Sequence, residues 1–291
     1  MTESTGSKDQ SDQKLLTWDE LPDWQQDNAY ILSSYRPASR SYKKSLQSIS
    51  QIHNEFVNIH SHLFGAVLFL ALPAFTYELS SYRDSSVKAG DIIVFSTFFY
   101  GVATCFLLSS TFHIIANHSP KVSAFGNQLD YLGIVILMWG STIPSVYYGF
   151  YCDPKLQKIY WSIVSFLALL CVIATMNPGF RGPKFRPYRS LMYIGLGFSA
   201  LGFVTHGLIL YGWKIQNARM SLTWMAWMAA FNMIGAIAYP ARVPERFAPG
   251  KFDIYGNSHQ ILHVMVIFAG LAHMFGQFNS FSHVHDTNFS C

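Results

Sequence analysis

Seven long segments that are apolar and nearly free of charge constrain this chain more than any other feature. Each is close to the roughly 20 residues that a helix needs to cross a bilayer. Short polar or Pro- and Gly-containing stretches separate them, including one at residues 214–217, and none leaves room for a soluble domain. We place the spans at residues 56–79, 91–115, 127–149, 157–176, 188–212, 219–239 and 258–279. The sequence therefore predicts an all-α membrane protein whose seven-transmembrane helix bundle covers residues 55–279.

The composition agrees with a membrane protein. Only 12% of the residues are charged and 51% are hydrophobic, whereas an average soluble chain carries about 25% charged residues. A net charge of +4 is too small to indicate nucleic-acid binding. The first residues are polar and contain no apolar core of a signal peptide, so we expect no cleavable signal.

The four cysteines form no CxxC motif. Cys105 and Cys171 lie within apolar segments, and we expect them to be buried thiols. The sequence leaves open whether Cys152 and Cys291 form a disulfide.

Two flanking regions complete the predicted organisation. Residues 1–54 form a cytoplasmic N-terminal arm, and its first 15 residues are expected to be disordered because they carry little apolar content. Between residues 42 and 53, three aliphatic side chains recur at helical spacing, namely Leu46, Ile49 and Ile52. This pattern suits a short amphipathic helix on the membrane surface, and an ordinary connector fits it equally well. Residues 280–291 form an extracytoplasmic tail.

Lysine and arginine in the loops predict the orientation. With the N-terminus inside, the arm and inner loops hold 14 of the 20 Lys and Arg residues, and the outer loops hold 6. This asymmetry predicts a cytoplasmic N-terminus and an extracytoplasmic C-terminus. A seven-span G-protein-coupled receptor has the opposite orientation.

A pair of histidines four residues apart marks the start of the last span. His259 and His263 share one helix face about 6 Å apart, which is close enough to bind one ion. The second span ends on the inner side at His113, and the third begins there near Asp130. Three histidines and a carboxylate from three helices are therefore expected at one depth. Ionisable groups at the membrane edge are costly and indicate a functional site, although polar residues placed by chance at helix ends would give the same pattern.

Three imidazoles are the ligand set of a catalytic zinc site, which leaves a fourth position for water or substrate. No cysteine lies near them, which argues against a closed structural site. We therefore predict that His113, His259 and His263 bind zinc. Zinc activates a water and polarises a carbonyl, and Asp130 is placed to hold that water and carry its proton. The alternative for Asp130 is a carboxylate that only stabilises its helix N-terminus.

Ser109 lies one turn before His113 on the same face, so its hydroxyl could bond the catalytic water or a substrate carbonyl. A bond back to its own helix is equally compatible. His62 could support the site from behind Glu55 and Asn58, but a structural polar contact is favoured. His206 and His273 fall in the outer halves of their spans, too far from the inner face, and are expected to pack or form hydrogen bonds. His118 lies in a loop, and His283 and His285 lie on the outer tail.

Several uncommon strings lie along the chain from Leu21 to about Gly276. They include LPDW, NIHSHLFG at 58–65, LDYLGI at 129–134, ARVPERFAPGKFDI at 241–254 and SHQILHV at 258–264. In these strings the chain resembles the progestin and adipoQ receptor family of the haemolysin III superfamily, and specifically its adiponectin-receptor-like branch with fungal zinc-homeostasis members.

The resemblance implies a seven-helix fold with the N-terminus inside and zinc held by His113, His259 and His263, with Asp130 near the water. It also implies ceramidase activity, in which the amide of a ceramide-type membrane lipid is cleaved to a sphingoid base and a fatty acid. Relatives are described as receptors and as regulators of zinc and lipid metabolism. On the resemblance we expect the plasma membrane, and any extracellular ligand is unknown.

Two other function classes stay open. In a membrane receptor, zinc would be purely structural and no lipid would be hydrolysed. A zinc transporter ranks lower, because carriers need polar groups along the whole path and the ionisable cluster here is confined to one end.

Overall fold

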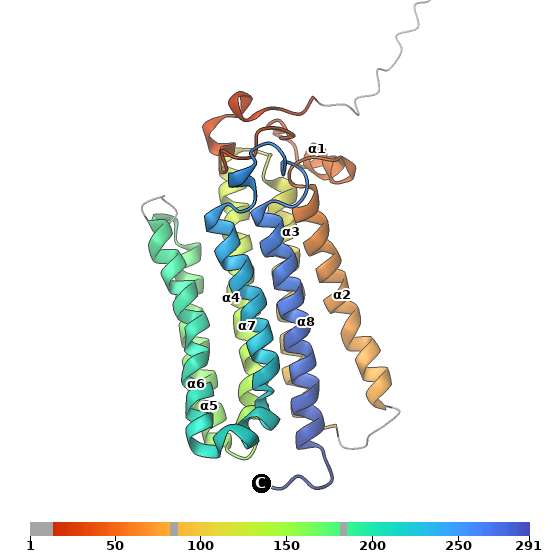
Figure 1. The fold of residues 1–291 in the computed structure, drawn as a ribbon, viewed down its shortest axis with the longest axis vertical. Coiled ribbons are helices and arrows are strands. Elements are labelled where there is room, and N and C mark those ends of the chain that lie inside the picture. The colour runs from red at the N-terminus through yellow and green to blue at the C-terminus, as the bar shows by residue number, and fades with distance from the viewer. Residues whose placement is uncertain (1–13, 82–86, 181–184) are drawn as a thin grey trace, which may run out of the picture.

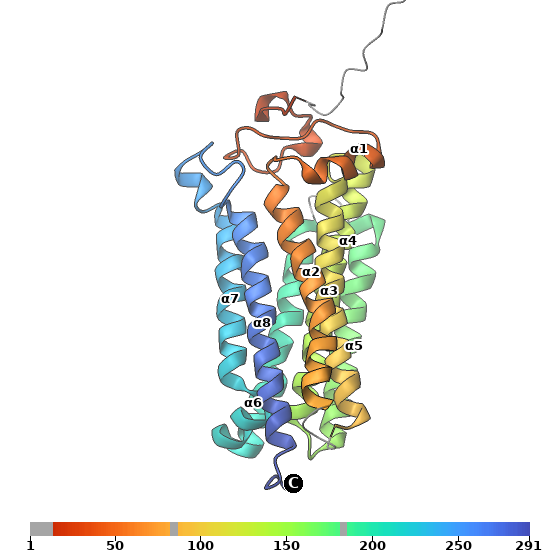
Figure 2. The same ribbon diagram turned by 90° about the vertical axis from the view of Figure 1, so that its right-hand side faces the viewer.

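The structure, a computed structural model, describes residues 14–81, 87–180 and 185–291. Within them, seven helices are long and apolar enough to cross a membrane, so the predicted all-α seven-helix bundle is confirmed. The helices are α2 (Phe56–Ser81), α3 (Ala89–Ile115), α4 (Pro120–Gly149), α5 (Pro154–Met176), α6 (Arg186–Met220), α7 (Leu222–Ala241) and α8 (Ser258–Val284). They stand side by side, with the N-terminal arm over one end and the C-terminus at the other (Figures 1 and 2). We call these the arm end and the tail end.

Local chemistry explains where several helices begin. α4 and α5 start with proline, whose fixed φ and missing N–H suit the first helical position. The Asp153 side chain caps α5 by accepting from the Leu156 N–H at 3.4 Å. The Asn257 side chain caps α8 by accepting from the Gln260 N–H at 3.1 Å. These caps satisfy N–H groups that have no partner within the helix.

The span predicted over residues 188–212 ends where α6 kinks, but the stretch at 214–217 that was expected to separate two spans is helical. Residues 213–220 are helical and continue α6 beyond a kink at Gly212, whose φ is 74° and ψ is 169°. Glycine adopts a positive φ at little cost, so the chain turns here and resumes helical structure across the tail end (Figure 1). Gln216 is fully buried, which explains how this polar stretch packs instead of forming a loop. The next helix begins at Leu222 and not at residue 219.

α3 and α4 form the most extensive helix pair in the bundle. Glycines allow their backbones to approach closely: a Cβ at Gly133 would lie 2.9 Å from the Cα of Cys105, and one at Gly140 would lie 2.8 Å from the Thr97 carbonyl oxygen. Small residues at helix interfaces serve this purpose in membranes. The tight pair holds the arm ends of α3 and α4 next to each other.

The arm lies across the arm end as a series of short turns. Its elements are η1 (Trp18–Glu20), η2 (Asp23–Gln25), α1 (Tyr42–Gln47) and η3 (Ser48–Ser50), and η4 (Pro178–Phe180) and η6 (Glu245–Phe247) lie in later loops. The helix expected over residues 42–53 is therefore shorter than predicted. Leu46 and Ile52 are more than half exposed, and contact with the membrane surface stays a prediction.

At the tail end, a Cys152–Cys291 disulfide fastens the end of the chain to the α4–α5 loop, which decides the question that the sequence left open. Cys105 and Cys171 are buried free thiols, as predicted. Most of the N-terminal stretch that was expected to be disordered lies outside the described residues. Four of the basic residues that were counted to predict the orientation also lie outside them, namely Lys8, Arg83, Arg181 and Lys184.

Candidate metal centre

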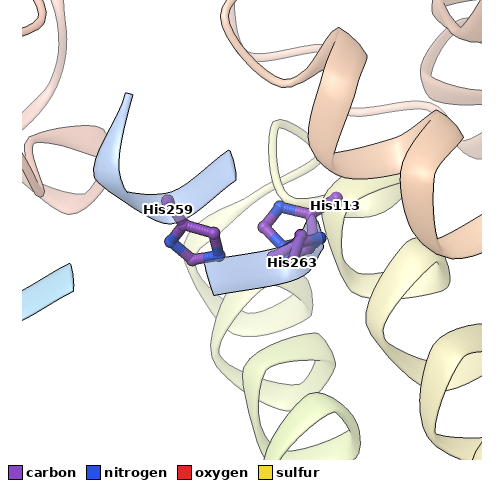
Figure 3. A group of neighbouring side chains, drawn as sticks. All are labelled: His113, His259 and His263. Carbon is purple, nitrogen blue, oxygen red and sulfur yellow. The ribbon is translucent and has the colours of Figure 1, made fainter. Parts of the chain in front are cut away.

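Three histidines converge at the arm end from two helices. His113 lies in the last turn of α3, and His259 and His263 lie in the first two turns of α8. One nitrogen of each ring lies within 4.8 Å of the others, and Figure 3 shows the rings gathered at one point. We call these residues the metal centre. Because His113 lies far along the chain from His259 and His263, tertiary packing that places α3 beside α8 brings the three imidazoles together.

His113 is held in one orientation by a carboxylate. Its Nδ1 donates to Glu55 Oε2 at 2.7 Å, and Asn58 Nδ2 donates to the same oxygen at 2.7 Å. The bond puts the ring proton on Nδ1, so Nε2 carries a free lone pair. That nitrogen is buried and has no hydrogen-bond partner. A histidine that donates one N–H to a carboxylate and presents the other nitrogen is the usual arrangement of a metal ligand.

The donor set therefore fits a metal ion such as zinc. Three neutral imidazoles suit Zn²⁺ and leave one position open. His263 is buried and has Ser61 Oγ 3.5 Å from its Nδ1, while His259 contacts the edge of the Tyr239 ring at a centroid distance of 4.8 Å. Without an ion, three close imidazoles and an unpartnered buried nitrogen would be a costly arrangement.

Asp130 and Ser109 lie beside the metal centre. The Asp130 carboxylate is close enough to His113 and Glu55 to interact electrostatically with both, and it lies next to Ser109. Ser109 Oγ is buried and forms no properly oriented hydrogen bond. The expected alternative, a bond back to its own helix, is not formed by Ser109, whereas the adjacent Ser110 does bond the Leu107 carbonyl at 3.1 Å.

His62 does not make the polar contact that we favoured. Its ring stacks on His263 with a centroid distance of 3.7 Å and packs against Phe106 at 4.7 Å. Both ring nitrogens are buried without a hydrogen-bond partner. The prediction of a structural polar contact is therefore wrong, and His62 belongs to the immediate surroundings of the metal centre.

His206 and His273 make contacts away from the metal centre, as expected. His206 Nδ1 forms a hydrogen bond of 2.8 Å with the Tyr160 hydroxyl, and His273 Nε2 lies 2.9 Å from the Ser141 carbonyl oxygen. At the tail end, His285 Nε2 donates to Asp91 Oδ2 at 3.0 Å. These contacts account for them as structural groups. His118 lies in the α3–α4 loop beside Tyr42.

Sequence reasoning overlooked the role of Glu55 beside the metal centre. The residue precedes the first span by one position, so its depth matched that of His113. The sequence does not show that Glu55 contacts His113. The two residues are 58 positions apart, so their contact depends on how α2 packs against α3.

Residues 50–274 match a family described as "Haemolysin-III related". The chain is 36% identical over 276 residues to the "ADIPOR-like receptor IZH2" of Saccharomyces cerevisiae, covering 94% of this chain and 86% of that protein. It is 32% identical over 264 residues to "Heptahelical transmembrane protein 1" of Arabidopsis thaliana, covering 89% and 79%.

An animal relative is longer. The chain is 36% identical over 263 residues to the "Adiponectin receptor protein" of Drosophila melanogaster, covering 90% of this chain but only 59% of that protein. The likeness to the fly protein therefore concerns the part that contains the helices, and what the whole fly protein binds does not follow for this chain.

Proposed function

Because this chain belongs to the haemolysin-III-related family and is an adiponectin-receptor-like seven-span membrane protein, we propose that it hydrolyses ceramide-type lipid amides at a zinc site within the membrane. The observation that carries the proposal is the convergence of three imidazoles beside a carboxylate and a buried serine hydroxyl. A site that only stabilised the helix bundle would need the imidazoles but would have no use for the last two groups.

His113, His259 and His263 would hold the ion, and Glu55 would keep the proton of His113 on Nδ1. When bound, zinc supplies Lewis-acid activation of a water and of the amide carbonyl. Asp130 accepts a proton from the attacking water and returns it to the leaving amine, as a general base and then a general acid. Ser109 donates a hydrogen bond to the substrate carbonyl or orients the water.

The position of the metal centre suits a lipid substrate. It lies where α3 ends and α8 begins, at the level where the spans leave the apolar region, which is the depth of a lipid headgroup amide. Acyl chains would then extend along the helices toward the bilayer centre. A diffusible polar amide would have no need of a buried site among membrane helices.

We also propose that the arm end faces the cytoplasm and the tail end the outside, in the plasma membrane. The loop charges favour this orientation. The Cys152–Cys291 disulfide at the tail end supports it independently, because disulfides persist in oxidising compartments. The product would be released on the cytoplasmic side, where a free sphingoid base can act as a signal in lipid and zinc homeostasis.

Two of the relatives are named as receptors, which favours a second function, that of a receptor; in that case zinc would be purely structural. The two functions separate in one experiment on the purified chain. We would measure bound zinc and release of free sphingoid base from ceramide vesicles for the parent, His113→Ala, His259→Ala, His263→Ala and Asp130→Asn.

The proposed hydrolase requires about one zinc per parent chain, loss of zinc and activity in the three histidine variants, and retained zinc without activity in Asp130→Asn. Zinc that is bound without any hydrolysis by the parent would favour the receptor. A parent that binds no zinc would contradict both functions.

A further inference from the structure

The arm reaches the end of α3 that carries His113. Arg36 is buried, and its Nη2 donates to the His113 carbonyl oxygen at 2.6 Å while its Nη1 donates to the Ile114 carbonyl oxygen at 3.1 Å. Both carbonyls belong to the last turn of α3, where carbonyls have no partner within the helix. The guanidinium also complements the negative end of the helix dipole. Arg36 therefore fixes the backbone of a metal-centre residue.

A buried carboxylate holds the start of α8 in the corresponding way. Glu245 in η6 is fully buried, and its Oε2 accepts from the Ser258 N–H at 2.8 Å while its Oε1 accepts from the Ser258 hydroxyl. Ser258 is the first residue of α8 and directly precedes His259. The negative charge lies at the positive end of the helix dipole, which is a favourable position.

One segment of the arm connects these two contacts. Asn28 Nδ2 donates to Glu245 Oε1 at 3.0 Å. The Leu32 N–H and the Ser33 hydroxyl donate to the two carboxylate oxygens of Asp253, at 3.0 and 2.7 Å, in the loop that leads to α8. Residues 28–36 thus contact the loop before α8 at one end and α3 at the other.

Burying these charges is expensive, which argues for a specific task. Burying a guanidinium or a carboxylate destabilises the fold strongly unless hydrogen bonds compensate the lost hydration. Burial lowers the pKa of Arg36 to about 10, so its side chain remains charged at neutral pH. Solvated polar residues could cap two helix ends with less loss of hydration, but they would not fix the helix ends relative to each other.

We propose that arm residues 28–36 form a strap that holds the ends of α3 and α8 at the spacing at which His113, His259 and His263 share one metal ion, with Arg36 and Glu245 as positioning residues. The inference rests on the proposed metal centre and adds that docking of the arm sets its affinity. A strap that is released would let the two helix ends separate, and the ion would be lost before the bundle unfolds.

The test compares zinc binding by full-length variants in detergent. Arg36→Gln removes the α3 contact, and Asn28→Ala removes the arm's bond to Glu245 while leaving α3 untouched. Lys14→Gln is the matched control, since it removes a cation from the same arm whose partner is the exposed Glu20 at 3.2 Å. Zinc affinity is measured by competition with a chromophoric chelator, and the Co²⁺ absorption spectrum reports the ligand geometry.

We expect both strap variants to bind zinc about 10-fold or more weakly, as when groups that orient metal ligands are removed, with an altered Co²⁺ spectrum. Lys14→Gln should match the parent. Melting temperatures are measured in excess chelator and in excess zinc. A variant with a weaker metal site gains less stability from the same zinc concentration than the parent does. A variant that is only less stable has a lower melting temperature in chelator but the same gain from zinc.

Two results would overturn the strap. One is unchanged zinc affinity in Asn28→Ala and in any Arg36→Gln protein that folds. The other is a lower melting temperature in chelator with the same zinc-dependent gain as the parent, which would make these residues merely structural. A parent that binds no zinc refutes the proposed function and the strap together, whereas a zinc-binding parent with unaltered variants refutes the strap alone.

Discussion

Glu55→Gln tests whether the carboxylate beside His113 tunes the metal centre. Glu55 accepts both His113 Nδ1–H and Asn58 Nδ2–H on the same oxygen, each at 2.7 Å. Glutamine has nearly the same shape, and its single carbonyl oxygen can accept both bonds. The substitution therefore removes the negative charge while preserving the hydrogen-bond geometry.

The expected magnitude follows from the two kinds of bond. A hydrogen bond to a charged group contributes about 1.5–3 kcal/mol, against about 0.5–1.5 kcal/mol for a neutral pair. The difference is on the order of 1 kcal/mol, and every 1.4 kcal/mol is a factor of ten in affinity. Glu55 is 26% exposed, so solvent screening places the effect at the lower end. We expect zinc affinity to fall about fivefold.

The assay is chelator competition, with Asp91→Asn as the matched control. Asp91 lies at the opposite end of α3 from His113 and accepts from His285 at 3.0 Å, so it is also a carboxylate paired with a histidine, but far from the metal centre. Its variant should lose stability and keep the parental zinc affinity. Equal zinc affinity in Glu55→Gln and the parent, or equal losses in both variants, would refute the reasoning.

Three further predictions concern His62, His53 and the Cys152–Cys291 disulfide. His62→Phe keeps the stack on His263 but removes two unpartnered nitrogens, so it should stabilise the zinc-free protein by about 1 kcal/mol or more in thermal unfolding; destabilisation would mean that the nitrogens have partners. Burial lowers the pKa of His53 to about 3. The unfolded chain then binds the extra proton below about pH 6.5, so stability falls as the pH drops from that value toward 3. The pH dependence should be flatter in His53→Gln than in the parent; identical slopes would contradict this. A membrane-impermeant maleimide should label Cys152 and Cys291 on intact cells only after reduction, and labelling without reduction, or only after permeabilisation, would contradict the disulfide or the orientation.

The bundle was predictable because membrane solvent imposes a strong local rule. Backbone groups in lipid must be satisfied within the segment, so a long apolar run implies a helix wherever it occurs. All seven helices appeared at the expected places for this reason. The prediction failed at residues 214–217, where polar composition suggested a loop. There, a glycine kink and a buried Gln216 made helical packing possible, and neither the kink nor the burial can be read from local composition.

The grouping of His113, His259 and His263 was predictable for a related reason. Helix direction and span order place each residue at a depth in the membrane, and matching depths were enough to group the three histidines with Asp130. The depth of a residue in the membrane does not show, however, which residues from other helices lie beside it. The Glu55 bond to His113, the stacking of His62 and the contact of Arg36 with the end of α3 all depend on which helices and arm segments pack together. The sequence alone therefore determined the helices and the level of the site, because these follow from local hydrophobicity. The surroundings that orient the ligands were decided by tertiary packing, because those contacts join residues that are far apart along the chain.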